Sequence, residues 1–431
     1  MTETLALLGG DPVRTAPYPI HDTMIGEEEE REVLEALRSK HLSGFSARPG
    51  DRFLGGPKVR AFEAAVAEYF GVKYAVTFNS ATSALHAMVS AVGAGPGDEV
   101  IVPPTTMSAT ATAVVMNNAV PIFADIENET YGLDPAATEA AITPQTKAIL
   151  AVNLFGHAAQ LHELEAIATR HNLVLLEDNS QSPGAKIGNR MVGTVGRMAA
   201  QSLNYHKAIQ TGEGGVVLTN DDRDALHLQL IRNHGEVVIG KLDVDEDQLV
   251  NVVGYNYRLS EVQAAIGIPQ VAKLNALLDI RYDLAGRLID GLKPFDFLIP
   301  PVTREDCTHV YYLFPIRYLA EKTGVSRSAF VEAVAAEGVA LAGGYVQPIY
   351  MEPMFQKLIA YGDKGCPFKC PMYEGNPKYS MGICPTAETL YGSELMTTDI
   401  CKYPNGPDEV DELIAAITKV AANFDHLRDR A

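Results

Sequence analysis

The chain has 431 residues, 47% of them hydrophobic, and this length exceeds what one core usually serves, so we expect two domains. Its 54 acidic residues outnumber its 35 lysines and arginines, and the net charge of −19 argues against a nucleic acid or an anionic membrane as partner. No apolar run is long enough for a membrane span and the first residues lack a basic flank, so we expect a cytoplasmic protein.

The first part of the chain predicts an arm followed by a helix. Residues 1–25 are punctuated by glycine and proline, which predicts an extended arm. Residues 26–40 have four glutamates directly after Gly26 and carry apolar residues on one face, a pattern typical of a helix whose acidic first turn complements the helix dipole. A glycine-rich loop at 43–56 follows.

From residue 56 onward, strands and helices alternate, which predicts an α/β domain with a mainly parallel sheet covered on both faces. The expected strands cover residues 74–78, 99–102, 120–124, 148–153, 173–177 and 216–219, and the expected helices cover 59–70, 80–88, 108–116, 136–141 and 161–171.

The last third predicts a smaller α+β domain. A long helical stretch at 262–292 would link the two domains, and a strand at 310–317, a helix at 327–337 and a terminal helix at 408–424 follow. Residues 367–405 have no regular pattern. We therefore expect a large domain at 1–285, which includes the arm, and a small domain at 286–431.

All five cysteines lie in this last third, at positions 307, 366, 370, 384 and 401. Cys366 and Cys370 suggest a zinc site, but a second ligand pair with suitable spacing is missing. Reduced structural thiols explain the cysteines better in a cytoplasmic protein, so we expect no metal site.

Two stretches carry residues suited to one kind of cofactor chemistry. Lys207 lies between an expected strand and the turn Gly212-Glu213-Gly214-Gly215, where burial would suit it to form a Schiff base with an aldehyde cofactor. Asp178 follows the buried strand at 173–177, and a carboxylate there can hold a pyridine nitrogen protonated while Gln181 donates to a ring hydroxyl. The alternative for Asp178 is a simple capping role.

Three further stretches would lie at the same edge of a parallel sheet, where such folds bind ligands. Ser80-Ala81-Thr82-Ser83 opens a helix and offers donors to a phosphate, although an ordinary helix cap explains it too. Ser202, five residues before Lys207, is a second phosphate donor. The turn at 254–259, which contains Asn256, either caps the long helix or joins the site.

Together these motifs resemble the PLP-dependent aminotransferases of the DegT/DnrJ/StrS group, which act on keto-sugars and keto-cyclitols. The similarity covers nearly the whole chain and implies the aspartate aminotransferase-like fold, which is PLP-dependent transferase fold type I. The matching stretches are 62–71, 75–76, 80–85, 97–104, 120–125, 177–181, 207–221, 254–267 and 384–388.

The resemblance implies a role for each matching residue. Lys207 would be the Schiff-base lysine and proton shuttle, and Asp178 and Gln181 would contact the ring nitrogen and ring oxygen of pyridoxal 5'-phosphate. Asn256 would reach the cofactor of a neighbouring subunit, which implies a homodimer with shared active sites. Met107 stands where the family carries an aromatic residue, and its thioether would pack on the ring. Thr82, Ser83 and Ser202 would bind the phosphate, and Ser80 and Ala81 would also contact the cofactor.

The acceptor is predicted from two features of the chain. Residues 5–14 and the long stretch 366–384 resemble members that aminate keto-cyclitols, which favours a scyllo-inosose-type acceptor with glutamine or glutamate as amino donor. Members that act on nucleotide-linked keto-sugars are usually shorter there, and this acceptor is the alternative. The candidate acceptor contacts, each of which has a packing or capping role as its alternative, are His157, Tyr205, Tyr345, Gln347 and Tyr350.

Three other functions are weighed against this one. A subset of the family replaces the lysine by histidine and catalyses dehydration, but counting back from Gly212 puts Lys207, and not His206, at that position. A non-catalytic PLP-binding regulator is disfavoured by the intact pair of Lys207 and Asp178. A nucleotide-binding oxidoreductase is disfavoured because no G-x-G-x-x-G motif joins the first strand to its helix.

Overall fold

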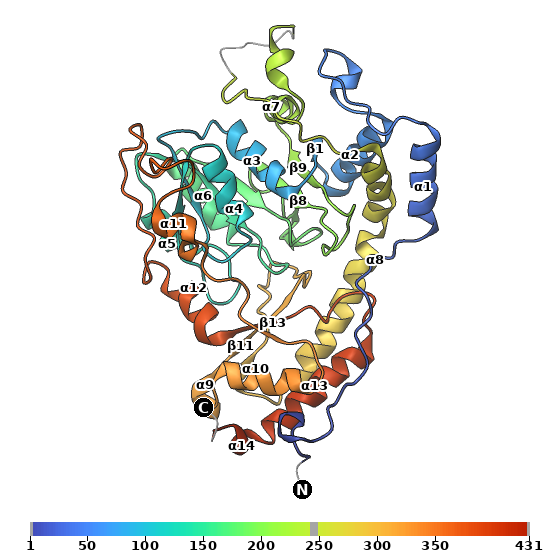
Figure 1. Ribbon diagram of the computed structural model, residues 1–431, viewed down its shortest axis with the longest axis vertical. Helices are drawn as coiled ribbons and strands as arrows, with labels where there is room; N and C mark the ends of the chain where they lie inside the picture. The colour runs from blue at the N-terminus through green and yellow to red at the C-terminus, as the bar shows by residue number, and fades with distance from the viewer. Residues whose placement is uncertain (1–2, 242–248, 429–431) are drawn as a thin grey trace.

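The computed structural model describes residues 3–241 and 249–428. Two lobes lie along the long axis of the molecule, and helix α8 (Glu261–Leu292) runs down one side of both (Figure 1). Among the described residues, no helix is long and apolar enough to cross a membrane. Within the same ranges, no cluster of three or more His, Cys, Asp or Glu side chains is arranged to hold a metal ion.

The upper lobe is built on a seven-stranded sheet. Strand β9 is antiparallel to β1 and β8, and the remaining neighbours are parallel, so the predicted mainly parallel sheet is confirmed. Its order is β1 (Tyr74–Phe78), β9 (Gly215–Thr219), β8 (Met198–Ser202), β5 (Val174–Asp178), β4 (Thr146–Val152), β2 (Glu99–Val102) and β3 (Val120–Phe123).

Helices cover both faces of this sheet because its strands bury side chains on both sides. In β4, Leu150 and Val152 belong to one apolar cluster, whereas Ile149 and Ala151 belong to another on the opposite face. The first cluster includes residues of α3 (Ala81–Ala91), α4 (Ala109–Met116) and α7 (Asp222–Arg232), and the second includes residues of α2 (Pro57–Phe70), α6 (Leu161–Arg170) and the first half of α8.

The lower lobe contains a four-stranded antiparallel sheet ordered β10 (Leu298–Ile299), β11 (Phe314–Tyr318), β13 (Leu395–Thr398) and β12 (Ala342–Gly343). Helices α10 (Arg327–Ala336) and α13 (Pro407–Ala421) contribute to its core. The remaining α-helices and strands among the described residues are α1 (Glu27–Arg38), α5 (Pro135–Ala140), β6 (Lys186–Ile187), β7 (Arg190–Met191), α9 (Ala320–Thr323), α11 (Pro353–Lys357), α12 (Pro385–Thr389) and α14 (Phe424–Arg428).

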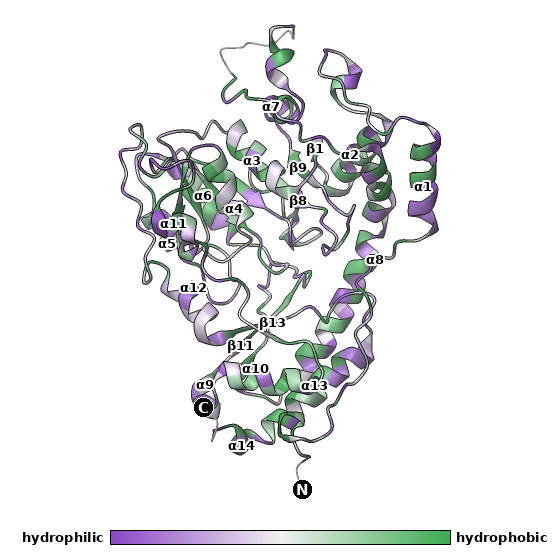
Figure 2. Cartoon of the chain, in the orientation of Figure 1, coloured by the Kyte–Doolittle hydropathy of each residue, from purple (hydrophilic) through white to green (hydrophobic). Residues whose placement is uncertain are grey.

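Several element bounds differ from those predicted. The strand expected at 310–317 begins only at Phe314, because Tyr311 has a left-handed backbone with φ 48° that no strand tolerates. The helix expected at 408–424 ends at Ala421, and the separate helix α14 follows it. The stretch 367–405, expected to be irregular, contains α12, a π-helical turn and β13. Helix α1 shows hydrophilic and hydrophobic residues side by side in Figure 2, as its amphipathic pattern predicts.

The packing links the two lobes at several points. Leu278 of α8 packs in a core of the upper lobe, and Leu284, less than two turns later, packs in the core of the lower lobe. Leu5 of the arm also joins the lower core, whereas Tyr350 packs with Phe123 of the upper sheet. The domain boundary at residue 285 therefore falls inside one continuous helix and stays a prediction.

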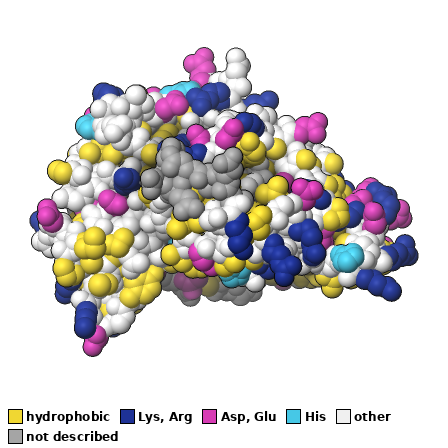
Figure 3. All heavy atoms as spheres, turned by 90° about the horizontal axis from the view of Figure 1, so that it is seen from above, with side chains coloured by type: hydrophobic (Ala, Val, Ile, Leu, Met, Phe, Trp, Pro, Cys, Tyr) yellow, Lys and Arg dark blue, Asp and Glu magenta, His cyan; other side chains and the backbone are white. Residues whose placement is uncertain are grey.

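The surface carries both signs of charge. Seen from above, lysine, arginine, aspartate and glutamate side chains are spread over the described surface, with hydrophobic side chains between them (Figure 3). This face thus shows charged groups of both signs despite the net charge of −19.

Candidate active site

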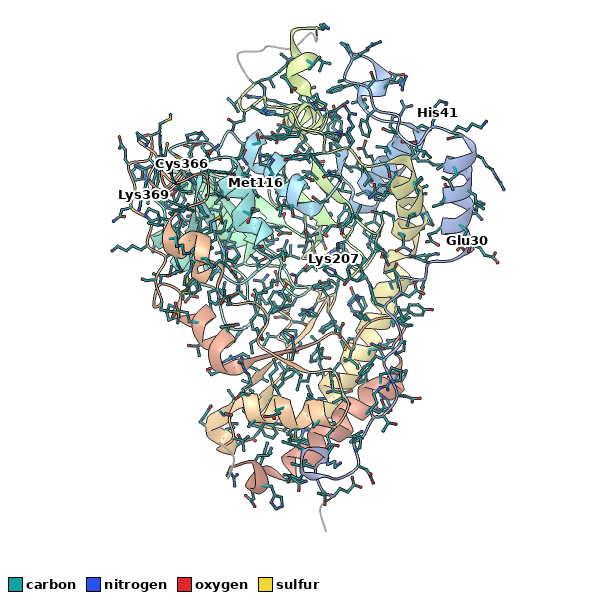
Figure 4. The ribbon with its side chains drawn as sticks, viewed as in Figure 1. Glu30, His41, Met116, Lys207, Cys366 and Lys369 are labelled. Carbon is teal, nitrogen blue, oxygen red and sulfur yellow. The ribbon has the colours of Figure 1, made fainter. Side chains whose placement is uncertain are left out.

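A pocket of about 190 Å³ lies at the carboxyl ends of β5 and β8, between the upper sheet and the lower lobe. Lys207 is near the middle of the molecule in Figure 4, far from Cys366 and Lys369 at its edge. The polar and titratable residues that line the pocket are Ser80, Thr82, Thr106, Asp178, Ser180, Gln181, Ser202, Asn204, His206, Lys207, Glu213, Tyr312 and Tyr345.

Lys207 is held by the loop between β8 and β9. Its backbone N–H donates to the carbonyl of Asn204 (2.9 Å), and the loop closes where Leu203 N–H donates to Gly214 O (3.0 Å). The side chain is only 8% exposed. Burial lowers the pKa of Lys207 to about 8, against the opposing effect of the Asp178 carboxylate. The amine is therefore neutral over a pH range in which an ordinary lysine is charged.

Asp178 ends β5, is buried and lines the pocket. One carboxylate oxygen accepts a hydrogen bond from Thr110 Oγ1 (3.1 Å), and the other accepts from the backbone N–H of Ser180 (3.1 Å). Gln181 is also fixed, because its Oε1 accepts from Phe155 N–H (2.9 Å) and its Nε2 donates to Tyr345 Oη (3.0 Å). One amide proton of Gln181 thus has a protein partner.

The start of α3 faces the same pocket. Ser80 caps the helix by accepting from Ser83 N–H (3.1 Å), while Ser83 Oγ donates to Asn79 Oδ1 (2.7 Å). A Cβ at Gly215 would lie 2.4 Å from Ser80 O, so only glycine lets β9 approach this helix start so closely. The positive end of the helix dipole is therefore directed at the pocket, where it suits a phosphate.

The structure brings together many of the residues singled out from the sequence. Ser80, Ala81, Thr82, Met107, Asp178, Gln181, Ser202, Lys207 and Tyr345 all line the pocket, with Met107 60% exposed at its mouth. Ser83 is engaged in the helix cap and does not line it. Asn256 is exposed on the turn before α8, outside the pocket lining of its own chain.

Four of the five predicted acceptor contacts lie outside this lining and most have protein partners. His157 is buried, donates from Nδ1 to Ala158 O (2.8 Å) and accepts at Nε2 from Arg304 N–H (3.2 Å). Tyr350 is buried with its hydroxyl on Glu388, and Gln347 donates to Glu352 Oε1 (2.8 Å). Tyr205 is 61% exposed. Of the five, only Tyr345 lines the pocket.

Other lining residues were not among those predicted from the sequence. Thr106 follows β2 and Asn204 precedes Lys207, so both could have been found from their place after a strand or beside the lysine. Tyr312 carries no local signal, because only the fold brings it to a lysine 105 residues away.

The residues of the pocket fit pyridoxal 5'-phosphate. They supply a partly neutral amine for an aldehyde, a buried carboxylate for a pyridine nitrogen, and a helix start with hydroxyl groups for a phosphate. Two buried polar atoms of lining residues, Ser180 Oγ and Asn204 Oδ1, have no hydrogen-bond partner within residues 3–241 and 249–428. A polar ligand in the pocket would give them partners.

This fold with this pocket defines a PLP-dependent aminotransferase of fold type I. Comparison with known proteins agrees: the chain matches the model of the DegT/DnrJ/EryC1/StrS aminotransferase family over residues 25–385 and belongs to that family.

Two curated relatives and one solved structure illustrate the likeness. The L-glutamine:2-deoxy-scyllo-inosose aminotransferase of Streptomyces lividus is 35% identical over 352 residues, covering 80% of this chain and 82% of that protein. The GDP-perosamine synthase of Caulobacter vibrioides is 36% identical over 279 residues, covering 64% and 73%. The structure of an aminotransferase from Psychrobacter cryohalolentis superposes with a TM-score of 0.80 at 26% identity, over 95% of this chain and 99% of that one.

Proposed function

We propose that the enzyme transfers an amino group from glutamine or glutamate to the ketone of a scyllo-inosose-type cyclitol. The observation that carries this acceptor is the 35% identity with a scyllo-inosose aminotransferase over 80% of the chain. A nucleotide-linked keto-sugar is the second candidate, because the GDP-perosamine synthase is equally similar over a shorter part of the chain.

Each residue of the pocket has a defined task in this proposal. Bound PLP supplies an aldehyde that exchanges amino groups and a ring that accepts electrons. The neutral ε-amine of Lys207 removes the proton from Cα of the amino acid and later returns a proton. Asp178, oriented by Thr110 and the Ser180 N–H, keeps a proton on the ring nitrogen. The start of α3 and Ser202 hold the phosphate.

We further propose a cytoplasmic homodimer with shared active sites. Asn256 is exposed and lies outside its own pocket, as expected of a side chain that serves the neighbouring subunit. All five cysteines are free thiols, which suits a reducing compartment.

The test of the acceptor starts from protein that carries pyridoxamine phosphate. This form is prepared with L-glutamine as amino donor in one series and with L-glutamate in a parallel series. Either 2-deoxy-scyllo-inosose or a GDP-linked 4-keto-sugar is then added. Return of the yellow band at about 420 nm, with an aminated product in the mass spectrum, identifies the acceptor. The proposal expects the cyclitol to restore the band at least tenfold faster. Restoration by the GDP-sugar alone would overturn the cyclitol assignment in favour of the second candidate.

A further inference from the structure

The ε-amine of Lys207 contacts the side chain of Tyr312, which comes from the lower lobe. Tyr312 Oη lies 3.4 Å from Lys207 Nζ, and the centre of the Tyr312 ring lies 4.5 Å from the same nitrogen. We propose that Tyr312 is a further catalytic residue, whose hydroxyl and ring face hold the free ε-amine of Lys207 while that amine carries a proton. This inference rests on the proposed role of Lys207 as the proton shuttle.

The backbone around Tyr312 is fixed by two other parts of the chain and has an unusual conformation. Tyr311 has a φ of 48°, a left-handed conformation that is unusual for a bulky residue and is retained only where surrounding structure imposes it. Arg281, buried on α8, donates to the carbonyls of Tyr311 (2.8 Å) and Tyr312 (3.3 Å). In addition, Val310 N–H donates to Gly156 O (2.8 Å).

Gly156 makes this close packing possible. A Cβ there would lie 2.6 Å from the backbone nitrogen of Tyr311 and 2.9 Å from that of Tyr312, so a larger residue would displace the segment. The Tyr312 ring is therefore held against the Lys207 ε-amine by the loop after β4, by helix α8 and by the strained backbone at Tyr311. Such a convergence indicates a built contact rather than an incidental one.

The chemistry of a phenol suits both states of the lysine. Burial raises the pKa of Tyr312 above its ordinary value, so the hydroxyl keeps its proton throughout the working pH range. That hydroxyl donates to the neutral amine and accepts from the ammonium, and the ring face attracts the ammonium without adding a charge. Tyr312 itself undergoes no net proton transfer. It stabilises Lys207 at the moment when the lysine holds the substrate proton.

Other titratable groups face this amine as well. Asp178 of β5 favours the ammonium, and His206, the chain neighbour, lines the same pocket. Burial, with Lys207 close by, lowers the pKa of His206 to about 4, so this imidazole stays neutral above pH 6. A change in Lys207 titration between pH 6 and 10 on altering Tyr312 is therefore not caused by His206.

The test uses the protein loaded with pyridoxamine phosphate, in which Lys207 is free. Competitive labelling with an amine reagent from pH 6 to 10, read by mass spectrometry against the exposed Lys147, gives the midpoint of Lys207 titration. The parent is expected near pH 8. Tyr312→Leu should lower the midpoint by about one pH unit, and Tyr312→Phe, which keeps the ring, by at most about 0.3.

Kinetics supply a second readout. The rate of the half-reaction with L-glutamine should fall about a hundredfold in Tyr312→Leu and about tenfold in Tyr312→Phe, with a larger isotope effect for α-deuterated glutamine. The matched control is Tyr345→Phe, which removes the other lower-lobe hydroxyl of the pocket, bonded to Gln181 and not to the lysine. It should leave the Lys207 midpoint unchanged.

A parent-like midpoint in Tyr312→Leu would overturn the inference. Should that variant not fold, an unchanged half-reaction rate in Tyr312→Phe would overturn it equally. Failure of the underlying proposal looks different: Lys207 would then be labelled as readily in the presence of pyridoxal phosphate as with pyridoxamine phosphate, because it would form no Schiff base.

Discussion

Glu177 offers a sharp test of how the site is held. This carboxylate precedes Asp178 in β5 and is completely buried. One oxygen accepts from the backbone N–H groups of Val195 (2.8 Å) and Gly196 (2.7 Å). The other accepts from Gly193 N–H (2.8 Å) and from the side-chain amide of Asn153 (2.9 Å). All four partners are hydrogen-bond donors, so both side-chain oxygen positions of residue 177 must be occupied by acceptors.

Glu177→Gln keeps the shape but turns one acceptor into a donor. Whichever way the new amide is oriented, its NH₂ faces two donors, and each buried N–H left without a partner costs about 1–3 kcal/mol. We expect a loss of about 3 kcal/mol. Since unfolding entropy is about 2.1 cal/mol/K per residue, or about 0.9 kcal/mol/K for 431 residues, Tm should fall by about 3 °C.

The assay is thermal unfolding followed by circular dichroism, because the chain has no tryptophan. Glu99→Gln is the matched control: Glu99 is also buried, but it accepts from the hydroxyls of Tyr373 and Thr143, which can rotate to accept instead. Its Tm should change by less than about 1 °C. Equal Tm losses in the two variants, or none in Glu177→Gln, would refute the reasoning.

Two further predictions concern buried charge. Burial lowers the pKa of His157 from 6.5 to about 4. Between these two pH values the unfolded chain binds more protons than the folded chain, so the free energy of unfolding decreases as the pH falls through this window. His157→Gln should reduce that decrease by about 2–3 kcal/mol, as measured by urea unfolding. Arg232 is fully buried and its guanidinium lies 2.5 Å from the Glu63 carboxylate. Arg232→Met should therefore lower the free energy of unfolding by about 3–5 kcal/mol, and adding Glu63→Gln should recover part of this loss. In a double-mutant cycle, strictly additive losses would contradict a coupled pair.

Much of the upper lobe could be predicted from the sequence because its strands are short apolar runs between amphipathic helices. The parallel neighbours β4 and β5 have this character. By contrast, no local sequence pattern indicates that β9 lies antiparallel between β1 and β8. In the lower lobe, the strand expected at 310–317 begins only at Phe314, because the backbone at Tyr311, which Arg281 holds and Gly156 packs against, is left-handed. The periodic pattern of apolar residues along the chain does not predict such long-range contacts.

The site shows the same division. Lys207 and Asp178 are predictable because Lys207 lies in the loop after β8 and Asp178 is the last residue of β5, each within a recognisable motif, and sheet topology brings both to one edge. His157 and Tyr350 were proposed from residue type alone, and the structure gives their polar atoms to Arg304 and Glu388 instead. Polar character does not reveal whether a side chain faces a pocket or a packed interior.

The central claim is that Lys207 bonds to the cofactor and moves the proton. Its most direct test is the absorbance spectrum of the purified protein beside Lys207→Ala, before and after L-glutamine or L-glutamate. We expect a band at about 420 nm in the parent that shifts to about 330 nm with the amino donor, and no such cycling in the variant. A protein that stays colourless after incubation with PLP, or a variant that cycles like the parent, would contradict it.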